Sequence, residues 1–218
     1  MRIVAVNVGG LREMHDGRGR SFYSGIEKSH VSGPVSIGFS GVIGDAQGNQ
    51  KAHGGPDNAV YVYSADHYAV WRREEHRDDL APGFFGENLT VAALHETDMR
   101  IGDLYRAGHA LLEVTQARAP CATLGLRFGE KNFPDRFLAS RRMGMYLRVL
   151  KEGDVQSGDE FHRERTGTVP LLEAVEVLYG NEATPQRLQR LKNESALSRR
   201  WRDKVDLLLA QCAANPAA

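Results

Sequence analysis

Short apolar runs separated by glycine and aspartate dominate the first three quarters of this chain. They are RIVAVNV (2–8), PVSIGF (34–39), AVYVY (59–63), NLTVA (88–92), ALLEVTQ (110–116) and MYLRVL (145–150). Enrichment in β-branched residues and frequent turn signals are typical of strands. Gly-Asp pairs at the edges of the runs, Gly44-Asp45 among them, are interpreted as turn markers. Because the runs show no regular βαβ rhythm, we expect a closed or nearly closed β-barrel.

Helical patterns are few before residue 163 and frequent after it. Within the β part we expect helices in SADHYAVWRREEH, with Ser64 as N-cap, and in FPDRFLASRR (133–142). Beyond residue 163, Thr168 is expected to cap a helix with Pro170 in its first turn and Gly180 at its end.

The C-terminal segment adds two more predicted helices. The first begins with Thr184 as N-cap and Pro185 at the first helical position. The second carries an apolar stripe at spacings of four, four, three and four, formed by Leu197, Trp201, Val205, Leu208 and Cys212. Cys212 is therefore interpreted as core filler. Because three short helices bury little alone, we expect a small bundle that also packs on the barrel.

The sequence thus predicts two units, a β-barrel domain over 1–162 and a three-helix domain over 163–218. The outer faces of the three helices carry mixed charge. Whether they bind a partner or form a homodimer is left open.

The overall composition excludes several classes of protein. Lys and Arg total 28, as do Asp and Glu, so no bulk charge attracts nucleic acid or an anionic membrane. The apolar runs fall short of the roughly 20 residues that span a bilayer. The N-terminus is interpreted as a first strand rather than a signal peptide. Two distant cysteines form no disulfide framework and exclude CxxC metal sites, so we expect a reduced, cytoplasmic setting.

Cys121 lies in QARAPCATL, where a strand gives way to a helix-like segment. Pro120 lacks a backbone donor and is expected to end the strand. A helix N-terminus and the positive charge of Arg118 would both favour the thiolate, which is the reactive and metal-binding form. Packing as a small buried hydrophobe explains the same residue, because cysteine is among the most buried residue types. The local sequence leaves both interpretations open.

Two further stretches place polar groups beside glycine turns. In QKAHGGPDN, His53 precedes Gly54 and Gly55, which would let the backbone approach an anion; an ordinary glycine turn is the alternative. In GFFGENLTV, Asn88 offers an acceptor and two donors, or merely ties down a loop. The eight histidines show no i,i+4 pair on a recognisable helix, so they predict no zinc site.

Four stretches together resemble those of MOSC-domain proteins, in this order and at these distances. They are HGGPDNAVYVY, GFFGENLTV, IGDLYRAGHALLEVTQARAPCATL and MGMYLRVLKEGDVQSGDEF. The match covers roughly residues 1–162, and the C-terminal helices resemble those of the YiiM-type subgroup. The resemblance implies a mainly β fold with helical additions. It consists of a MOSC β-barrel similar to the barrel domain of pyruvate kinase, followed by a small three-helix bundle. It also implies the molybdenum cofactor, Mo-molybdopterin.

The matching motif positions imply roles for individual residues. Cys121 corresponds to the proposed catalytic residue and thiolate ligand to molybdenum, which suits a metal already held by dithiolene sulfurs. Positive groups near it would meet the pterin phosphate. The cofactor-binding residues implied in this way are Lys28, His53, Gly54, Asn88, Arg118, Arg141 and Arg142. For the last two, solvated loop arginines are the alternative.

The resemblance further implies an oxidoreductase that reduces small N-hydroxylated compounds of the hydroxylaminopurine type. No flavin, haem or iron–sulfur motif is visible, so an electron-donor protein is the expected partner. A carrier of sulfur, as a persulfide on cysteine, or of the cofactor itself is the alternative. The chain departs from the usual family pattern at Asn58, Ala117 and Met145, where lysine, proline and tryptophan are frequent.

Overall fold

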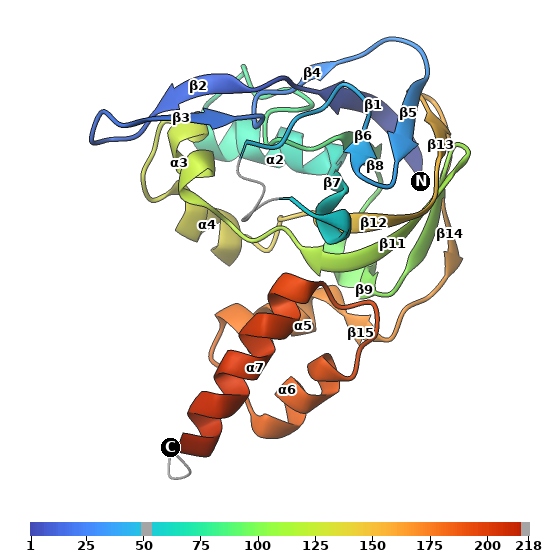
Figure 1. Cartoon of the computed structure of the whole chain (residues 1–218). Helices are drawn as coiled ribbons and strands as arrows, with labels where there is room; N and C mark the ends of the chain where they lie inside the picture. The colour runs from blue at the N-terminus through green and yellow to red at the C-terminus, as the bar shows by residue number, and fades with distance from the viewer. Residues whose placement is uncertain (49–53, 215–218) are drawn as a thin grey trace.

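The computed structural model describes residues 1–48 and 54–214 (Figure 1). Its strands are β1 (Arg2–Val8), β2 (Arg12–His15), β3 (Ser21–Ser24), β4 (Ser29–His30), β5 (Val35–Gly38), β6 (Gly41–Val42), β7 (Val60–Ser64), β8 (Leu89–Ala92), β9 (Arg100–Ile101), β10 (Leu104–Ala107), β11 (Ala110–Ala117), β12 (Met145–Lys151), β13 (Gly153–Val155), β14 (Phe161–Arg165) and β15 (Val169–Pro170). Its helices are η1 (Pro56–Asn58), α2 (Ala65–Glu75), η2 (Glu96–Asp98), α3 (Ala122–Phe128), α4 (Phe133–Ala139), α5 (Leu171–Tyr179), α6 (Pro185–Lys192) and α7 (Arg199–Ala214). All six apolar runs fall on strands, as the sequence predicts.

The largest sheet has the strand order β14-β10-β11-β12-β7-β8-β1-β4. Its neighbours are antiparallel except β7 and β8, which are parallel and are joined through α2. The central strands β7 and β11 are buried over most of their length, because helices cover one side and the curled sheet encloses the other.

The two edges of this sheet meet along a short stretch. Ile3 N donates to Asp159 O at 2.9 Å, and Arg2 forms an isolated bridge with Glu160, just before β14. In the described part of the chain these few contacts replace a continuous β1–β14 ladder. The barrel is therefore nearly closed rather than closed.

An aromatic cluster fills the space between the sheet and the helices α2 and α4. Trp71 stacks on Phe137 with ring centroids 6.2 Å apart, and Phe85 packs against both. Helix α2 begins where the sequence predicts, because the Ser64 hydroxyl accepts a hydrogen bond from Asp66 N at 3.3 Å. This cluster is the support behind the site described below.

The C-terminal helices correct one sequence prediction and confirm another. Thr184 caps α6 by accepting from Arg187 N at 3.3 Å, as expected. Thr168 does not cap α5: the helix begins at Leu171 with Pro170 as its N-cap. Pairing of β15 with β9 draws this segment into an extended conformation before the helix starts.

Within the described residues, no helix is both long and apolar enough to cross a membrane.

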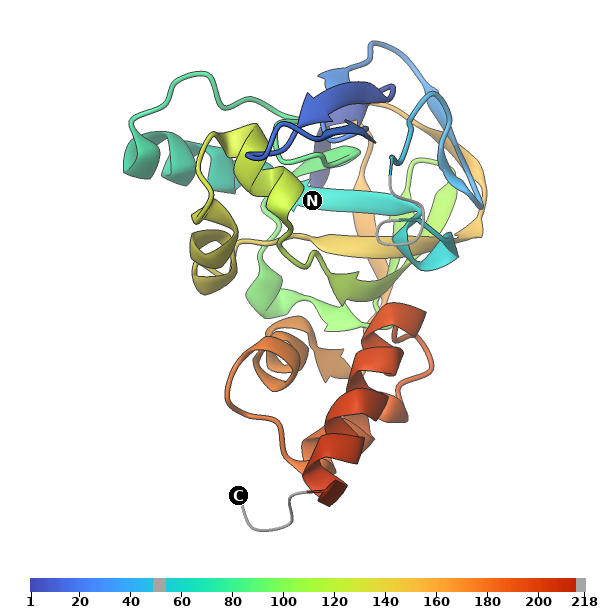
Figure 2. The ribbon, with the colours of Figure 1, turned by 60° about the vertical axis from the view of Figure 1, so that its left-hand side comes forward.

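Helix α7 begins beside the sheet, where Asp57 joins its N-terminus to two strands. Figure 2 shows α5, α6 and α7 gathered on one side of the sheet, with the N-terminus of α7 nearest to it. The Asp57 carboxylate accepts from Arg199 N at 2.7 Å and pairs with Arg148 of β12 at 2.9 Å. The Asp57 carbonyl accepts from Thr115 of β11 at 2.7 Å. Ser198 N donates to Thr115 O at 3.1 Å, so α7 and two sheet strands share this junction.

Candidate functional site

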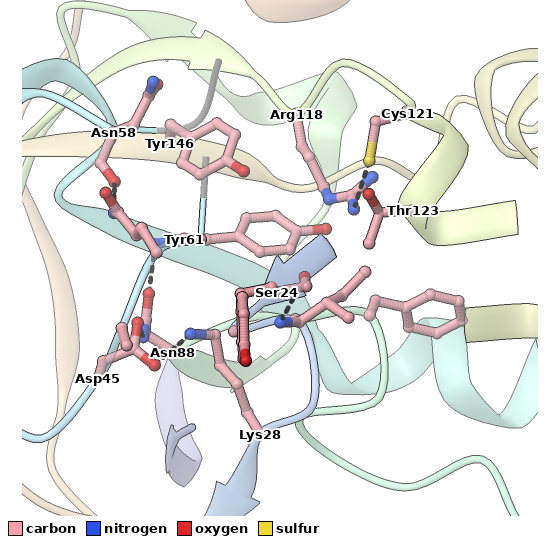
Figure 3. A pocket seen from close by; sticks show the side chains of 18 of the residues that line it. Ser24, Lys28, Asp45, Asn58, Tyr61, Asn88, Arg118, Cys121, Thr123 and Tyr146 are labelled. Carbon is pink, nitrogen blue, oxygen red and sulfur yellow. Dashed lines mark hydrogen bonds and ion pairs between the residues drawn. The ribbon is translucent and has the colours of Figure 1, made fainter. Parts of the chain in front are cut away.

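A cavity of about 140 Å³ opens between the β2–β3 hairpin, β7, β12 and the connection from β11 to α3. Four of the residues singled out by the sequence line it: Lys28, Asn88, Arg118 and Cys121. Figure 3 shows them on two facing walls, with Arg118 and Cys121 on one and Lys28 and Asn88 on the other. The fold thus brings together residues that are up to 93 positions apart in sequence (28 to 121).

The first wall carries the thiol. Strand β11 ends at Ala117, three residues before Pro120, and Cys121 is the N-cap of α3 in an extended conformation. Arg118 Nη2 lies 3.9 Å from Cys121 Sγ. The strand-to-helix transition expected at the cysteine is therefore present, although the strand ends before the proline rather than at it.

Arg118 is held deep in this wall and is only 4% exposed. Its guanidinium lies 5.4 Å from the ring centroids of both Tyr61 and Phe137. Nη1 is buried and has no hydrogen-bond partner within residues 1–48 and 54–214. Burial lowers the pKa of Arg118, but the nearby Cys121 thiolate and tyrosine oxygens outweigh it, so the net pKa is raised and the group stays charged. An unsatisfied buried guanidinium N–H is costly unless a ligand accepts from it.

On the second wall the charged groups are paired with each other. Lys28 and Asp45 form an ion pair and are 6% and 7% exposed. The second oxygen of Asp45 accepts from Asn88 Nδ2 at 2.9 Å, and Gly9 N also donates to the carboxylate at 2.9 Å. Burial lowers the pKa of Lys28, and Asp45 opposes that shift only in part. The Gly44-Asp45 pattern predicted only a turn, so this role of Asp45 was not predicted from the sequence.

Asn88 serves the protein as well as the cavity. Its Oδ1 accepts from Tyr61 N at 3.0 Å, and its own backbone N donates to Tyr61 O at 2.8 Å. The side chain therefore ties the loop before β8 to β7, which is the structural role that the sequence left open. Its Nδ2 remains directed at Asp45 beside the cavity (Figure 3).

A buried carboxyl lies behind this wall. Glu87 Oε1 accepts from Tyr68 Oη at 2.6 Å, Gly83 N at 2.7 Å and Thr90 Oγ1 at 2.8 Å, while Oε2 is buried without a partner. Burial raises the pKa of Glu87. The group holds the loop from Gly83 to Asn88 in place. No sequence signal marked it, because GENLT is equally typical of an exposed turn.

Gly54 and Arg141, two of the predicted cofactor-binding residues, are not brought to the cavity. Gly54 lies outside its lining, although its carbonyl accepts from Asn58 Nδ2 at 3.1 Å and Asn58 does line it. Arg141 pairs with Glu176 at 2.6 Å. His53 lies outside the described residues.

Arg142 is likewise directed away from the cavity. Its guanidinium lies 3.9 Å from the Trp71 ring centroid and bonds Glu74 of α2 at 3.0 Å. The end of α4 directs both Arg141 and Arg142 toward other helices. Neither arginine lines the cavity.

A metal cofactor that carries its own sulfur ligands would need few ligands from this site. Among the described residues, no three His, Cys, Asp or Glu side chains converge as a protein-built metal site would require. Cys121 would supply one soft ligand to a metal that brings its others with it. The unsatisfied Arg118 Nη1 suits an anionic or oxygen-bearing group beside that metal. These residues fit the metal end of such a cofactor. The cavity, at about 140 Å³, is smaller than the roughly 300–1,000 Å³ that ligand sites usually have. The pterin would therefore extend beyond it.

Comparison with known proteins identifies the family to which the chain is similar. The model of the MOSC domain matches residues 49–162. YflK of Bacillus subtilis is 36% identical over 84% of each chain. YiiM of Escherichia coli is 31% identical over 82% of this chain and 81% of its own length. A protein named Reductase from Gibberella moniliformis is 38% identical over 65% of this chain, which is 26% of its own length.

A solved structure resembles the whole fold. The crystal structure of YiiM from Geobacillus stearothermophilus superimposes with a TM-score of 0.81 and 28% identity, covering 95% of this chain and 98% of that one. The agreement extends over the sheet and the C-terminal helices. The chain therefore belongs to the MOSC-domain family.

Proposed function

We propose that this protein is a molybdenum cofactor-dependent reductase of small N-hydroxylated compounds, with Cys121 as the protein ligand to the metal. The observation that carries the proposal is the wall of Cys121 and Arg118, with a thiol 3.9 Å from a buried guanidinium that keeps an unsatisfied N–H. A relative named Reductase supports the class of reaction.

Each wall would have a separate task. Cys121 would hold the metal, and the buried guanidinium of Arg118 would stabilise negative charge that develops on oxygen beside it. Asn88 and Lys28 would shape the opposite side. The bound cofactor would supply the two-electron redox chemistry.

The electrons would come from a donor protein, because the sequence shows no motif for a second redox group. The same proposal includes a reduced, cytoplasmic setting. It also includes the division into a β-barrel domain over 1–162 and a three-helix domain over 163–218. Neutral overall charge gives nucleic acid no role in it.

Metal analysis and turnover of one preparation test the proposal. Protein expressed with molybdate and an intact cofactor pathway should carry about one molybdenum per chain and reduce 6-hydroxylaminopurine with a low-potential donor. Cys121→Ser should lose both properties while keeping its fold, since serine is a good N-cap for α3. A persulfide on Cys121 in metal-free protein without turnover would instead support the carrier.

A further inference from the structure

Three tyrosines line the cavity: Tyr23, Tyr61 and Tyr146. Tyr23 of β3 is largely exposed, and the hydroxyls of the other two differ. Tyr61 Oη donates to the carbonyl of Met143 at 2.9 Å. In the described part of the chain, Tyr146 is bonded through its backbone carbonyl, which accepts from Thr115 Oγ1 at 3.1 Å, and not through its hydroxyl. Of the two buried hydroxyls, that of Tyr146 is therefore the one that no described residue occupies.

The Tyr146 side chain is directed at the wall that holds the thiol. Its ring packs on Tyr61 with centroids 5.1 Å apart, and Figure 3 shows its oxygen pointing toward Arg118. The charged and titratable groups that face it are Arg118, Cys121, Arg200 of α7, Asp45 and the Tyr61 ring. The hydroxyl thus shares the cavity with the group that would hold the metal.

The surroundings suit a group that gives up a proton and takes it back. Burial raises the pKa of Tyr146, so the hydroxyl stays protonated at neutral pH. Arg118 and Arg200 act in the opposite direction and favour the tyrosinate. A donor that is protonated at rest and whose anion lies beside fixed positive charge meets the requirement for general acid catalysis.

We propose that Tyr146 is the proton donor in cleavage of the N–O bond; this inference rests on the proposed reduction of N-hydroxylated compounds. The reaction R–NH–OH + 2e⁻ + 2H⁺ gives R–NH₂ + H₂O. The N–O bond breaks, the departing oxygen takes the proton of Tyr146, and the nitrogen takes a proton from solvent. The two electrons come from the donor protein by way of the bound cofactor. Solvent at the cavity mouth then reprotonates the tyrosinate.

An equilibrium experiment on the cofactor-free full chain tests the contact. Binding of 6-hydroxylaminopurine and of adenine is measured by calorimetry for the wild type, Tyr146→Phe and Tyr61→Phe. Because one neutral hydrogen bond distinguishes the two ligands, the wild type should prefer the hydroxylamine by roughly three- to tenfold. Tyr146→Phe should abolish that preference and Tyr61→Phe should keep it. A preference that survives in Tyr146→Phe, or is absent from the wild type, would overturn the assignment.

A kinetic experiment on the loaded enzyme tests the proton transfer. General acid catalysis typically contributes about 10²- to 10⁴-fold, so kcat of Tyr146→Phe should fall by at least about a hundredfold with little change in KM. The remaining rate should then fall with rising pH between pH 6 and 9, because solvent must supply the proton, while the wild-type rate stays flat. Tyr61→Phe should retain the flat profile.

The outcomes separate the two proposals. Turnover by the wild type with an equal kcat in Tyr146→Phe would overturn the proton donor and leave the reductase intact. Absence of turnover in wild-type protein that carries molybdenum would overturn the reductase, and the proton donor with it.

Discussion

The charged groups are paired on one wall of the cavity and incompletely paired on the other. On one, Lys28 and Asp45 neutralise each other and Asn88 completes the carboxylate. On the other, Arg118 lies beside Cys121 with a buried N–H that has no acceptor among the described residues. Proteins rarely leave such a donor unsatisfied, because desolvation then costs free energy without return. Buried donors on Arg127, Arg142, Arg148 and Trp201 also lack a partner among the described residues, but none of these residues lines the cavity. The difference supports the proposal that the Lys28 wall stabilises the fold and that a ligand binds at the Arg118 wall.

Replacing the thiol should have the largest effect on function. Cys121→Ser should lower turnover by more than about a thousandfold, since even residues that only support a metal ligand typically cost 10- to 100-fold. The measurement is turnover per chain with a low-potential donor. Cys212→Ser is the matched control, because Cys212 packs on the C-terminal helices and should leave turnover within about twofold. Equal losses in the two variants would contradict the division of roles.

Breaking the ion pair should have the largest effect on stability. Asp45→Ala leaves the buried Lys28 charge without its partner, and the free energy of unfolding should fall by about 3 kcal/mol. Urea denaturation gives the value. The double variant Lys28→Met/Asp45→Ala should recover most of the loss, because no uncompensated charge remains. A double variant as unstable as the single one would show that the pair is not the cause.

Replacing the planar guanidinium of Arg118 by another cation should lower catalytic efficiency. Arg118→Lys keeps the positive charge but loses the planar fork, so kcat/KM should fall by about tenfold or somewhat more. Arg141→Lys makes the same change on an arginine that pairs with Glu176 away from the cavity. Its kcat/KM should stay within about twofold. A comparable loss there would restore the sequence prediction for Arg141.

Titration of the carboxyl behind the Lys28 wall should have the smallest effect. Burial raises the pKa of folded Glu87 above its unfolded value, so the folded state holds the proton longer as pH rises. Stability should therefore decline, by on the order of 1 kcal/mol, as pH rises from the unfolded value near 4.5 through the folded one. Glu87→Gln mimics the protonated form and should flatten this dependence in thermal melts taken across that range. An unchanged slope would assign the dependence to other groups.

The strands and the thiol were predictable because their signals are local. Each apolar run has its own β-branched residues and turn boundaries. The change from strand to helix at Cys121 is predicted by the nine consecutive residues QARAPCATL. The motifs of the MOSC family then pointed to the neighbours of the cysteine. Of these, Lys28, Asn88 and Arg118 do line one cavity.

What the sequence missed depends on distant partners. Asp45 has the local appearance of a turn residue and acquires its role only from Lys28, 17 positions earlier. Thr168 has the local appearance of a cap, but the pairing of Val169 with Ile101 overrides it. Tyr61 and Tyr146 are ordinary strand residues by pattern, and only the packed structure shows which hydroxyl is already used.

The Asp57 junction limits how this protein can be divided. The family match ends at residue 162, yet Ser198 donates to the backbone of β11 only three residues before Arg118, and Arg199 is bonded to the loop that bears Asn58. A chain cut after the match would therefore lose the contacts that hold β11 in place beside Arg118. Anyone grafting this barrel onto another protein, or exchanging barrels between relatives, should move the last helix together with it.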